Sequence, residues 1–170
     1  MNLNCILIGD CNVGKTHLLS SLRKPYRKKY MYIPTIGVDF HSYGNLRIWD
    51  TSGHPRFMTI TKTFIRSSDL CILCYNDEKS YKNLPMYIEH VNNYMKDDCK
   101  IMILSFCKDV QWEVEGMVLA NTISCDFKIC DVEKKESCME FFDKLIPKPN
   151  VKTKELPTME RDQYCWWNWW

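Results

Sequence analysis

Eight consecutive residues near the N-terminus have the types and the spacing that bind a phosphate chain. The segment Gly9-Asp10-Cys11-Asn12-Val13-Gly14-Lys15-Thr16 matches the pattern G-x-x-x-x-G-K-[ST]. In this pattern, backbone N–H groups of the loop surround the phosphates and the lysine amino group reaches their oxygens. The hydroxyl of the last residue binds Mg²⁺. We therefore expect residues 10–16 to bind phosphate and Thr16 to be a magnesium ligand.

A second segment supplies a carboxylate that could complete the magnesium site. Ile48-Trp49-Asp50-Thr51-Ser52-Gly53 is a short apolar run that ends in an aspartate. In phosphate-binding folds of this kind, such an aspartate helps to hold Mg²⁺. The alternative is an ordinary aspartate in a turn or a helix cap. We expect Asp50 to be a magnesium ligand.

The pattern of apolar runs predicts the elements that must position these residues. A strand at Cys5–Ile8 precedes the glycine loop, and a helix at His17–Arg23 follows it. Further strands are predicted at Leu46–Trp49, Leu70–Tyr75, Ile101–Phe106 and Cys125–Cys130. Apolar residues three or four apart predict amphipathic helices, the first with Leu84, Ile88, Val91 and Met95 and the second with Cys138, Phe142 and Leu145. Alternating strands and helices predict an α/β fold, with a mostly parallel central sheet and helices on both faces.

Composition narrows the class of protein. The 170 residues are 45% hydrophobic, and 23 Lys+Arg nearly balance 21 Asp+Glu, which predicts one globular domain with no bulk affinity for nucleic acid. The longest apolar run, Leu70–Tyr75, is too short to span a bilayer, and the N-terminus lacks a basic signal-peptide start. We expect a protein that is neither secreted nor integral to a membrane.

The ten cysteines are scattered along the chain, several of them within apolar runs. This distribution is typical of reduced thiols in a cytosolic core rather than of a disulfide scaffold. Cys71-Ile72-Leu73-Cys74 is a C-x-x-C motif without a second pair. Because side chains alternate along a strand, its two sulfurs should point to opposite faces. We expect buried strand cysteines here, with a zinc or redox site as the alternative.

The composition changes after Ile146, where the chain becomes polar and rich in proline. We therefore expect one domain over residues 1–146 and a flexible tail over residues 147–170. The tail ends in Cys165-Trp166-Trp167-Asn168-Trp169-Trp170. Its tryptophans could lie at a lipid interface or in a groove of a partner. A tail that folds back onto the domain and the chance product of an altered reading frame are the alternatives.

Two longer motifs resemble one family. Pro34-Thr35-Ile36-Gly37-Val38-Asp39-Phe40, followed by Trp49–Phe57 and Thr59-Ile60-Thr61, is similar to a Rab-type small GTPase of the Ras superfamily, from residue 4 to about residue 106. The resemblance implies a P-loop NTPase fold and a switch that binds GTP or GDP with Mg²⁺. It also implies trafficking effectors and regulators as partners, and a cytoplasmic location, peripheral on endomembranes.

The resemblance also assigns roles to individual residues. Thr35 would be the threonine of switch I that senses the γ-phosphate and Mg²⁺, and Gly53 would offer its backbone N–H to the γ-phosphate in switch II. The aromatic triad that faces effectors would fall on Phe40, Trp49 and Phe64. Ordinary core packing of these three rings is the alternative.

The motifs that read the base depart from the family pattern. Where the family has N-K-x-D, the chain reads Phe106-Cys107-Lys108-Asp109. Asp109 would still accept hydrogen bonds from guanine. The side-chain stem of Lys108 would pack as the family's lysine does, from a shifted position. Where the family has S-A-K, the chain reads Cys130-Asp131-Val132, and no residue can be carried over. We expect guanine to be bound through Asp109 and Lys108 but read more loosely than in the family.

The catalytic position also differs. His54 stands where the family has the glutamine that positions the attacking water, and Pro55 follows it. Asp50-Thr51-Ser52-Gly53-His54 also resembles the D-x-x-G-H of translational GTPases, whose histidine places the water. We expect His54 to be the catalytic residue of a slow GTPase, with an exposed loop histidine of no catalytic role as the alternative.

Three further features set the chain apart from the family. Few residues separate Phe40 from Trp49, which predicts a short inter-switch hairpin that turns at Gly44-Asn45 and an altered set of partners. The basic run Arg23–Lys29 could steer an anionic nucleotide, a lipid or a partner, or could be a solvated helix end. The tail lacks a C-terminal arrangement for prenylation, which leaves peripheral membrane contact to its tryptophans.

These observations lead to one main hypothesis and two rivals. The main hypothesis is a divergent Rab-like switch that binds guanine nucleotide, acts in vesicle trafficking and hydrolyses GTP slowly. The first rival is a pseudo-GTPase, an interaction module that keeps the fold and binds trafficking partners without nucleotide cycling. The second is a P-loop protein for ATP or mixed nucleotides.

Overall fold

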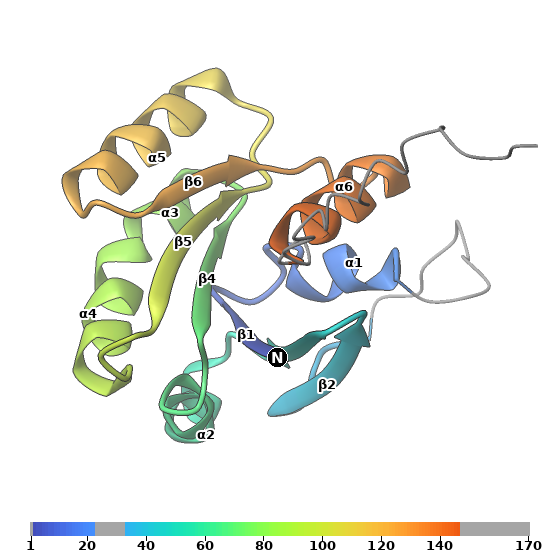
Figure 1. Cartoon of the computed structure of the whole chain (residues 1–170). Coiled ribbons are helices and arrows are strands. Elements are labelled where there is room, and N and C mark those ends of the chain that lie inside the picture. The colour runs from blue at the N-terminus through green and yellow to red at the C-terminus, as the bar shows by residue number, and fades with distance from the viewer. Residues whose placement is uncertain (1, 23–32, 147–170) are drawn as a thin grey trace, which may run out of the picture.

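A computed structural model describes residues 2–22 and 33–146, which form a six-stranded sheet (Figure 1). The strand order is β2-β3-β1-β4-β5-β6, and only the pairing of β2 with β3 is antiparallel. The strands are β1 (Leu3–Ile8), β2 (Val38–Tyr43), β3 (Leu46–Thr51), β4 (Leu70–Tyr75), β5 (Lys100–Ser105) and β6 (Asp126–Ile129). The mostly parallel sheet predicted from the sequence is confirmed.

Helices cover both faces of this sheet (Figure 1). One face packs against α1 (Lys15–Ser20) and α6 (Lys135–Leu145). The other face packs against α2 (Met58–Ile65), α3 (Glu78–Lys82), α4 (Leu84–Tyr94) and α5 (Val110–Thr122). A short 3₁₀ helix, η1 (Pro55–Phe57), leads into α2. This arrangement is the P-loop α/β fold, with the ends of several parallel strands at one edge of the sheet.

The central strands β1, β4 and β5 are apolar on both sides because each side faces a separate core. Leu7 packs with α1 and α6, whereas its neighbours Ile6 and Ile8 pack with the helices of the other face. Cys74 belongs to the first core and Cys71 to the second, as the alternation of a strand requires. The nine cysteines in the described ranges are all free thiols, and seven of them are buried.

The hairpin between β2 and β3 is as short as predicted. Tyr43 pairs with Leu46, so Gly44 and Asn45 alone form the turn. Gly44 has a φ of 57°, a left-handed conformation that glycine adopts without strain.

The helices differ more from the sequence prediction than the strands, whose ends shift by one or two residues. The helix predicted at His17–Arg23 begins at Lys15 and ends at Ser20, because the glycine loop runs directly into it. The helices α2 and α3 were not predicted. The basic run 23–29 and the tail 147–170 lie outside the described residues, so the predictions for them stay predictions. In the part of the chain that the structure describes, no helix is long and apolar enough to cross a membrane.

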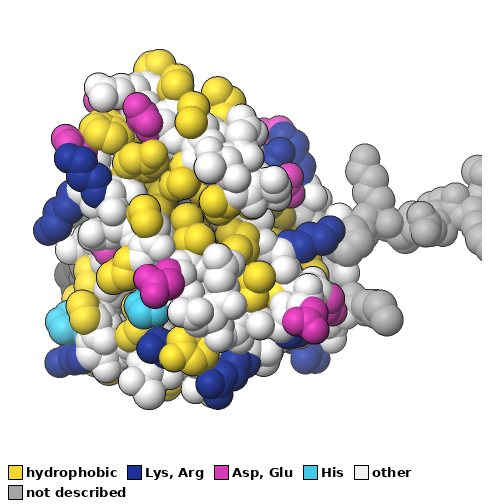
Figure 2. Space-filling model, turned by 90° about the vertical axis from the view of Figure 1, so that its left-hand side faces the viewer, with side chains coloured by type: hydrophobic (Ala, Val, Ile, Leu, Met, Phe, Trp, Pro, Cys, Tyr) yellow, Lys and Arg dark blue, Asp and Glu magenta, His cyan; other side chains and the backbone are white. Residues whose placement is uncertain are grey.

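The helix α5 is apolar on two sides. Gly116 and Ala120 are buried against the sheet, while the outward side carries the exposed residues Val110, Val114, Met117 and Val118. Figure 2 shows hydrophobic side chains on this side of the molecule, from the top, where α5 lies, toward the middle. The outward side of α5 is therefore an exposed apolar surface.

Candidate functional site

The phosphate loop connects β1 to α1 and passes close under β4. Gly9 has a φ of 147°, and a Cβ placed on it would lie 2.2 Å from the carbonyl oxygen of Cys74. Asn12 and Gly14 also have positive φ, 65° and 115°. Asparagine tolerates this conformation better than most residues, so the loop can adopt the sharp turns that expose its N–H groups.

Lys15 lies at the base of the loop with only 4% of its surface exposed. Its Nζ donates hydrogen bonds to the carbonyl oxygens of Gly9 and Asp10, both at 2.7 Å. Burial lowers the pKa of this amino group, and the nearby Asp50 carboxylate opposes that shift. Because both of these hydrogen bonds go to neutral carbonyl oxygens, the charge of the ammonium is available for an anionic ligand.

The three predicted magnesium ligands lie together, although they come from distant segments. Thr16 is in the first turn of α1, Thr35 precedes β2, and Asp50 is near the end of β3. Oδ2 of Asp50 accepts hydrogen bonds from the hydroxyls of Thr16 (2.5 Å) and Thr35 (3.1 Å). The two hydroxyl oxygens are 3.0 Å apart. Three oxygens that could ligate a metal ion therefore lie around one point.

The Asp50 carboxylate shows a further sign of a cation site. It is fully buried, and its second oxygen, Oδ1, has no hydrogen-bond partner among the described residues. Burial raises the pKa of this carboxyl, while Thr16 and Lys15 act in the opposite direction. In the described ranges, no group of three or more His, Cys, Asp or Glu side chains could hold a metal. The oxygens of Thr16, Thr35 and Asp50 instead fit Mg²⁺, because this ion prefers oxygen ligands and uses one or two carboxylates together with phosphates.

A cavity of about 340 Å³ opens beside these groups. Its volume is within the usual range for small-molecule sites. Residues of the phosphate loop, α1, the segment before β2 and the end of β3 line it: Asn12, Gly14, Lys15, Thr16, His17, Thr35, Thr51 and Ser52. Lys15, Thr16 and Thr35 thus face one common space, as a phosphate and Mg²⁺ site requires.

The side chain of Asp10 turns away from Lys15 toward α4. Its Oδ2 accepts a hydrogen bond from Nδ2 of Asn83 (2.7 Å), and its Oδ1 accepts one from the hydroxyl of Tyr87 (2.8 Å). Burial and this hydrogen bond to Asp10 raise the pKa of Tyr87. Sequence reasoning missed Asn83 and Tyr87, because nothing in the helical pattern shows which loop the helix contacts.

Gly53 packs directly on the phosphate loop. It has a φ of 71°, and a Cβ placed on it would lie 2.4 Å from the carbonyl oxygen of Gly9. Next to it, the sulfur of Cys11 is 3.5 Å from the carbonyl oxygen of Ser52. Only glycine fits at this contact, and the segment after β3 begins against the loop that would hold the phosphates.

His54 follows Gly53 and caps the short helix η1. Its side chain is exposed, and Nδ1 accepts a hydrogen bond from the backbone N–H of Arg56 (3.2 Å). The imidazole ring is 6.2 Å from the ring of Phe57. The structure therefore places His54 beside the phosphate loop but outside the lining of the 340 Å³ cavity.

The segment after β5 contains the residues predicted to bind the base. Phe106 is buried, and its ring lies 3.2 Å from the position that a Cβ on Gly14 would occupy. Lys108 is exposed and forms an ion pair with Glu133 (3.1 Å). Asp109 caps α5, and its Oδ1 accepts a hydrogen bond from the backbone N–H of Gln111 (2.9 Å). An aromatic ring thus packs against the phosphate loop, and the polar side chains lie farther out.

The predicted aromatic triad forms a continuous stack. Phe40 pairs with Trp49 across the hairpin, with ring centroids 4.8 Å apart, and Trp49 contacts Phe64 of α2 at 4.5 Å. Phe40 is 48% exposed, whereas Trp49 and Phe64 are half-buried. The stack joins the hairpin to α2 and presents one ring to solvent.

Comparisons with known proteins agree with this geometry. The Ras family profile matches residues 4–150. The chain is 31% identical over 176 residues to the Ras-related protein RABC2b of Arabidopsis thaliana, covering 94% of this chain and 83% of the relative. It is 28% identical over 158 residues to the Ras-related protein RabC of Dictyostelium discoideum, covering 83% of this chain and 80% of the relative. It is 28% identical over 154 residues to the Ras-related protein SEC4 of Saccharomyces cerevisiae, covering 82% and 71%.

Proposed function

The chain belongs to the Ras family and is a small GTPase of the Rab type, and from this membership we propose that it is a guanine-nucleotide switch of vesicle trafficking that hydrolyses GTP slowly. The observation that carries the proposal is the meeting of Thr16, Thr35 and Asp50 beside the buried Lys15. Proteins of this family bind GTP or GDP with Mg²⁺, which would here neutralise charge on the phosphates.

Each polar group at the site has a distinct role in this proposal. The amino group of Lys15 and the N–H groups of residues 10–16 hold the phosphates, because their positive ends converge on one loop at the start of α1. Thr16, Thr35 and Asp50 hold Mg²⁺ through the oxygens that lie within 2.5–3.1 Å of one another. The unpaired Oδ1 of Asp50 then acquires the charged partner that the described residues do not give it.

The two switch segments report on the γ-phosphate. Thr35 from the segment before β2 and Gly53 from the segment after β3 both lie at the phosphate loop. Thr35 would lose a ligand interaction when the γ-phosphate leaves, and so would the N–H of Gly53. Because Gly53 leads through η1 into α2, its release would also move the half-buried Phe64 and the stack that it forms with Trp49.

Slow hydrolysis follows from the position of His54. The imidazole has to place water near the γ-phosphate, but Nδ1 already accepts the N–H of Arg56. Only Nε2 is left to contact water, and Pro55 restricts the backbone at the start of η1. Because His54 is not among the residues that line the cavity, we infer that its side chain must move before it can act, which adds a step to a reaction that is already slow in this family without an activator.

The base would be held by Asp109 and Lys108. Gln111 uses only Oδ1 of Asp109, so Oδ2 is left to accept from the guanine N1–H and amino group. Lys108 would have to leave Glu133 to pack on the base, since the two side chains are paired at the surface. Phe106 supplies apolar contact in place of a hydrogen-bonding asparagine, so guanine would be bound with less discrimination.

Effectors and regulators would dock on the stack of Phe40, Trp49 and Phe64. Phe40 is the exposed member, and an aromatic ring at a surface is a common anchor of protein interfaces. The hairpin that carries Phe40 is short, with a two-residue turn, which favours a partner set that differs from that of the relatives. The tail from residue 147 would add peripheral contact with membranes through its tryptophans.

The content of the purified protein tests the main proposal. The full chain is purified without added nucleotide and denatured, and the released nucleotides are separated by chromatography. Stoichiometric GDP or GTP is the expected result, and Lys15→Ala is the matched variant that should release none. An empty site that also ignores added GDP, GTP and Mg²⁺ would contradict the proposal and favour the pseudo-GTPase. Release of ADP or ATP would favour the mixed-nucleotide rival.

Flotation with liposomes tests the tail separately. The full chain and a version ending at Lys148 are mixed with vesicles of neutral and anionic phospholipids. Binding that is lost on truncation is the expected result. Equal flotation of both versions would assign membrane contact to the domain, and no flotation of either would remove the membrane role.

A further inference from the structure

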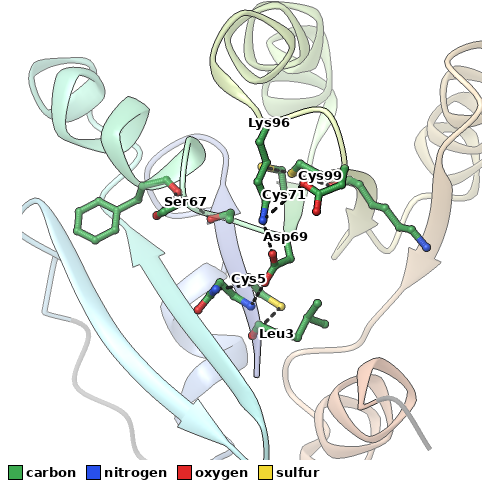
Figure 3. A network of polar contacts seen from close by, with 12 residues as sticks. Leu3, Cys5, Ser67, Asp69, Cys71, Lys96 and Cys99 are labelled. Atoms are coloured by element: carbon green, nitrogen blue, oxygen red, sulfur yellow. Dashed lines mark hydrogen bonds and ion pairs between the residues drawn. The ribbon is translucent and has the colours of Figure 1, made fainter. Parts of the chain in front are cut away.

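Two cysteines far from the nucleotide site lie within van der Waals contact. Cys71 is in β4, and Cys99 immediately precedes β5, the neighbouring parallel strand. Their sulfur atoms are 3.6 Å apart, and both side chains belong to the core on the α2–α5 face of the sheet. Figure 3 shows the two sulfurs facing each other beside the side chain of Lys96, which extends to Asp69.

The register of the sheet explains this contact. Cys71 pairs with Ile101, so Cys99, two residues earlier and just before β5, lies on the same face of the sheet. The backbone N–H of Cys99 bonds to the carbonyl of Lys96 in the turn after α4. One partner is therefore fixed in a central strand, while the other is at the end of a turn, where a small shift could bring the sulfurs to the bonding distance of about 2.05 Å.

The two thiols differ in exposure and in electrostatics. Cys71 is fully buried, whereas Cys99 retains 8% of its surface. The hydrogen bond from Cys71 and the charge of Lys96 lower the pKa of Cys99, and the same hydrogen bond raises the pKa of Cys71. Cys99 is thus the less buried of the two thiols, and the nearby Lys96 ammonium favours its thiolate, with the thiol of Cys71 in contact with it.

Among the described cysteines, the other close pair is more buried and its sulfurs are farther apart. Cys130 and Cys138 have sulfurs 4.0 Å apart, and both have 2% or less of their surface exposed. Cys5 is fully buried in the opposite core, and burial raises its pKa to about 12. These cysteines serve as comparisons within the same protein, because they differ from Cys71 and Cys99 in the exposed fraction of the side chain or in the distance between sulfurs.

We propose that Cys71 and Cys99 form a redox modification site, a dithiol that a hydroperoxide converts to a disulfide between β4 and the start of β5. This inference goes beyond the nucleotide switch and does not depend on it. The thiolate of Cys99 attacks one peroxide oxygen, the O–O bond breaks, and a sulfenic acid and water form after uptake of a proton. The sulfur of Cys71 then attacks the sulfenic sulfur, and the hydroxyl leaves as water with the Cys71 proton. Two thiols and one hydrogen peroxide thus give one disulfide and two waters.

The bond would close a loop of 28 residues that contains α3, α4 and the turn with Lys96. A crosslink of this length restricts the unfolded chain, so the oxidised protein should unfold at a temperature roughly 5–10 °C higher than the reduced protein. The same bond would also hold the C-terminal end of α4 against the sheet.

Peptide mapping of the full chain tests the site. The purified protein is titrated with hydrogen peroxide under native conditions, quenched with a maleimide, digested without reductant and analysed by mass spectrometry. The expected first disulfide joins Cys71 to Cys99, with a mass loss of two hydrogens. A first disulfide between Cys130 and Cys138, or a Cys99 that reacts no faster than Cys5, would overturn the proposal.

Substitutions separate the two steps. In Cys71→Ser, a dimedone-type reagent should trap a sulfenic acid on Cys99, because nothing is left to resolve it. In Cys99→Ser, Cys71 should stay reduced. Cys138→Ser is the matched control and should form the Cys71–Cys99 bond at the wild-type peroxide concentration. An unaltered unfolding temperature after oxidation would contradict the crosslink, and this measurement needs no variant.

Discussion

Tyr87 of α4 donates a hydrogen bond of 2.8 Å to the carboxylate of Asp10, the second residue of the phosphate loop. Asn83, one turn earlier, donates to the other oxygen of the same carboxylate. The opposite end of α4 carries Tyr94, whose ring lies under the cations of Lys62 and Arg66 from the region of α2. The helix therefore connects the phosphate loop with the segment that follows switch II, and a change at either end has a path to the other.

The first prediction concerns this connection. Tyr87→Phe keeps the ring in the core and removes the hydrogen bond to a charged group, which is worth about 1.5–3 kcal/mol. Because part of this energy orients the loop for phosphate, GDP should dissociate roughly 5–30 times faster, as measured by release of a fluorescent GDP analogue. Tyr81→Phe is the control, since Tyr81 bonds to the carbonyl of Glu115 instead. Equal off-rates for wild type and Tyr87→Phe would mean that Asp10 needs no such support.

The second prediction follows from the burial of Asp50, which raises the pKa of its carboxyl. A raised pKa in the folded state means that folding favours the protonated carboxyl. The protonated Asp50 carboxyl therefore contributes to stability below its unfolded-state pKa, and this contribution is lost as the pH rises through its folded-state pKa. Without nucleotide and Mg²⁺, Asp50→Asn should stabilise the protein at pH 7 and flatten this pH dependence, while weakening Mg²⁺ binding at least tenfold.

Thermal unfolding with and without GDP and Mg²⁺ checks both parts of that prediction. The amide oxygen of asparagine can still accept from Thr16 and Thr35, so the hydrogen bonds of the site are kept and only the charge is removed. Asp97→Asn, at an exposed turn, is the control and should change neither the unfolding temperature without nucleotide nor the binding of Mg²⁺. A lower unfolding temperature for nucleotide-free Asp50→Asn would show that the charge is already compensated within the chain.

The third prediction tests whether Asp109 reads the base. Guanine presents an N1–H and an amino group to the carboxylate, while xanthine presents an N1–H and a carbonyl. Asp109→Asn should therefore weaken GDP binding by roughly 10- to 100-fold and favour the xanthine nucleotide, because an amide can both accept and donate. Asparagine is also a good N-cap, so the bond to Gln111 and the start of α5 should be retained.

Competition between GDP, ADP and the xanthine diphosphate measures this change. Asp131→Asn serves as the comparison, because Asp131 lies after β6 and bonds to the N–H of Glu133. An unchanged preference in Asp109→Asn would assign base binding to other groups. In that case the ring of Phe106, which packs on Gly14, would be the next candidate for contact with the base.

The sequence was sufficient for the parts of the fold that depend on local chemistry. The glycine loop, the strand before it and the two-residue turn at Gly44 each follow from residue types at neighbouring positions. The meeting of Thr16, Thr35 and Asp50 was predictable only through the family resemblance, since Thr35 has no local signal of its own. The contacts of Asp10 with α4 and of Cys71 with Cys99 were not predictable, because they depend on how helices and strands distant in the chain pack together.

The last prediction separates two roles of His54, as a helix cap and as the residue that places water. Nδ1 of His54 accepts the N–H of Arg56 at the start of η1, and asparagine can make the same bond. His54→Asn should therefore keep the local structure, whereas His54→Ala should lose the cap as well. If the imidazole places water, both variants should hydrolyse bound GTP more slowly than wild type, by roughly 3- to 10-fold, in a single-turnover experiment. A normal rate in His54→Asn combined with a slow rate in His54→Ala would assign the effect to the cap, and normal rates in both would remove His54 from the reaction.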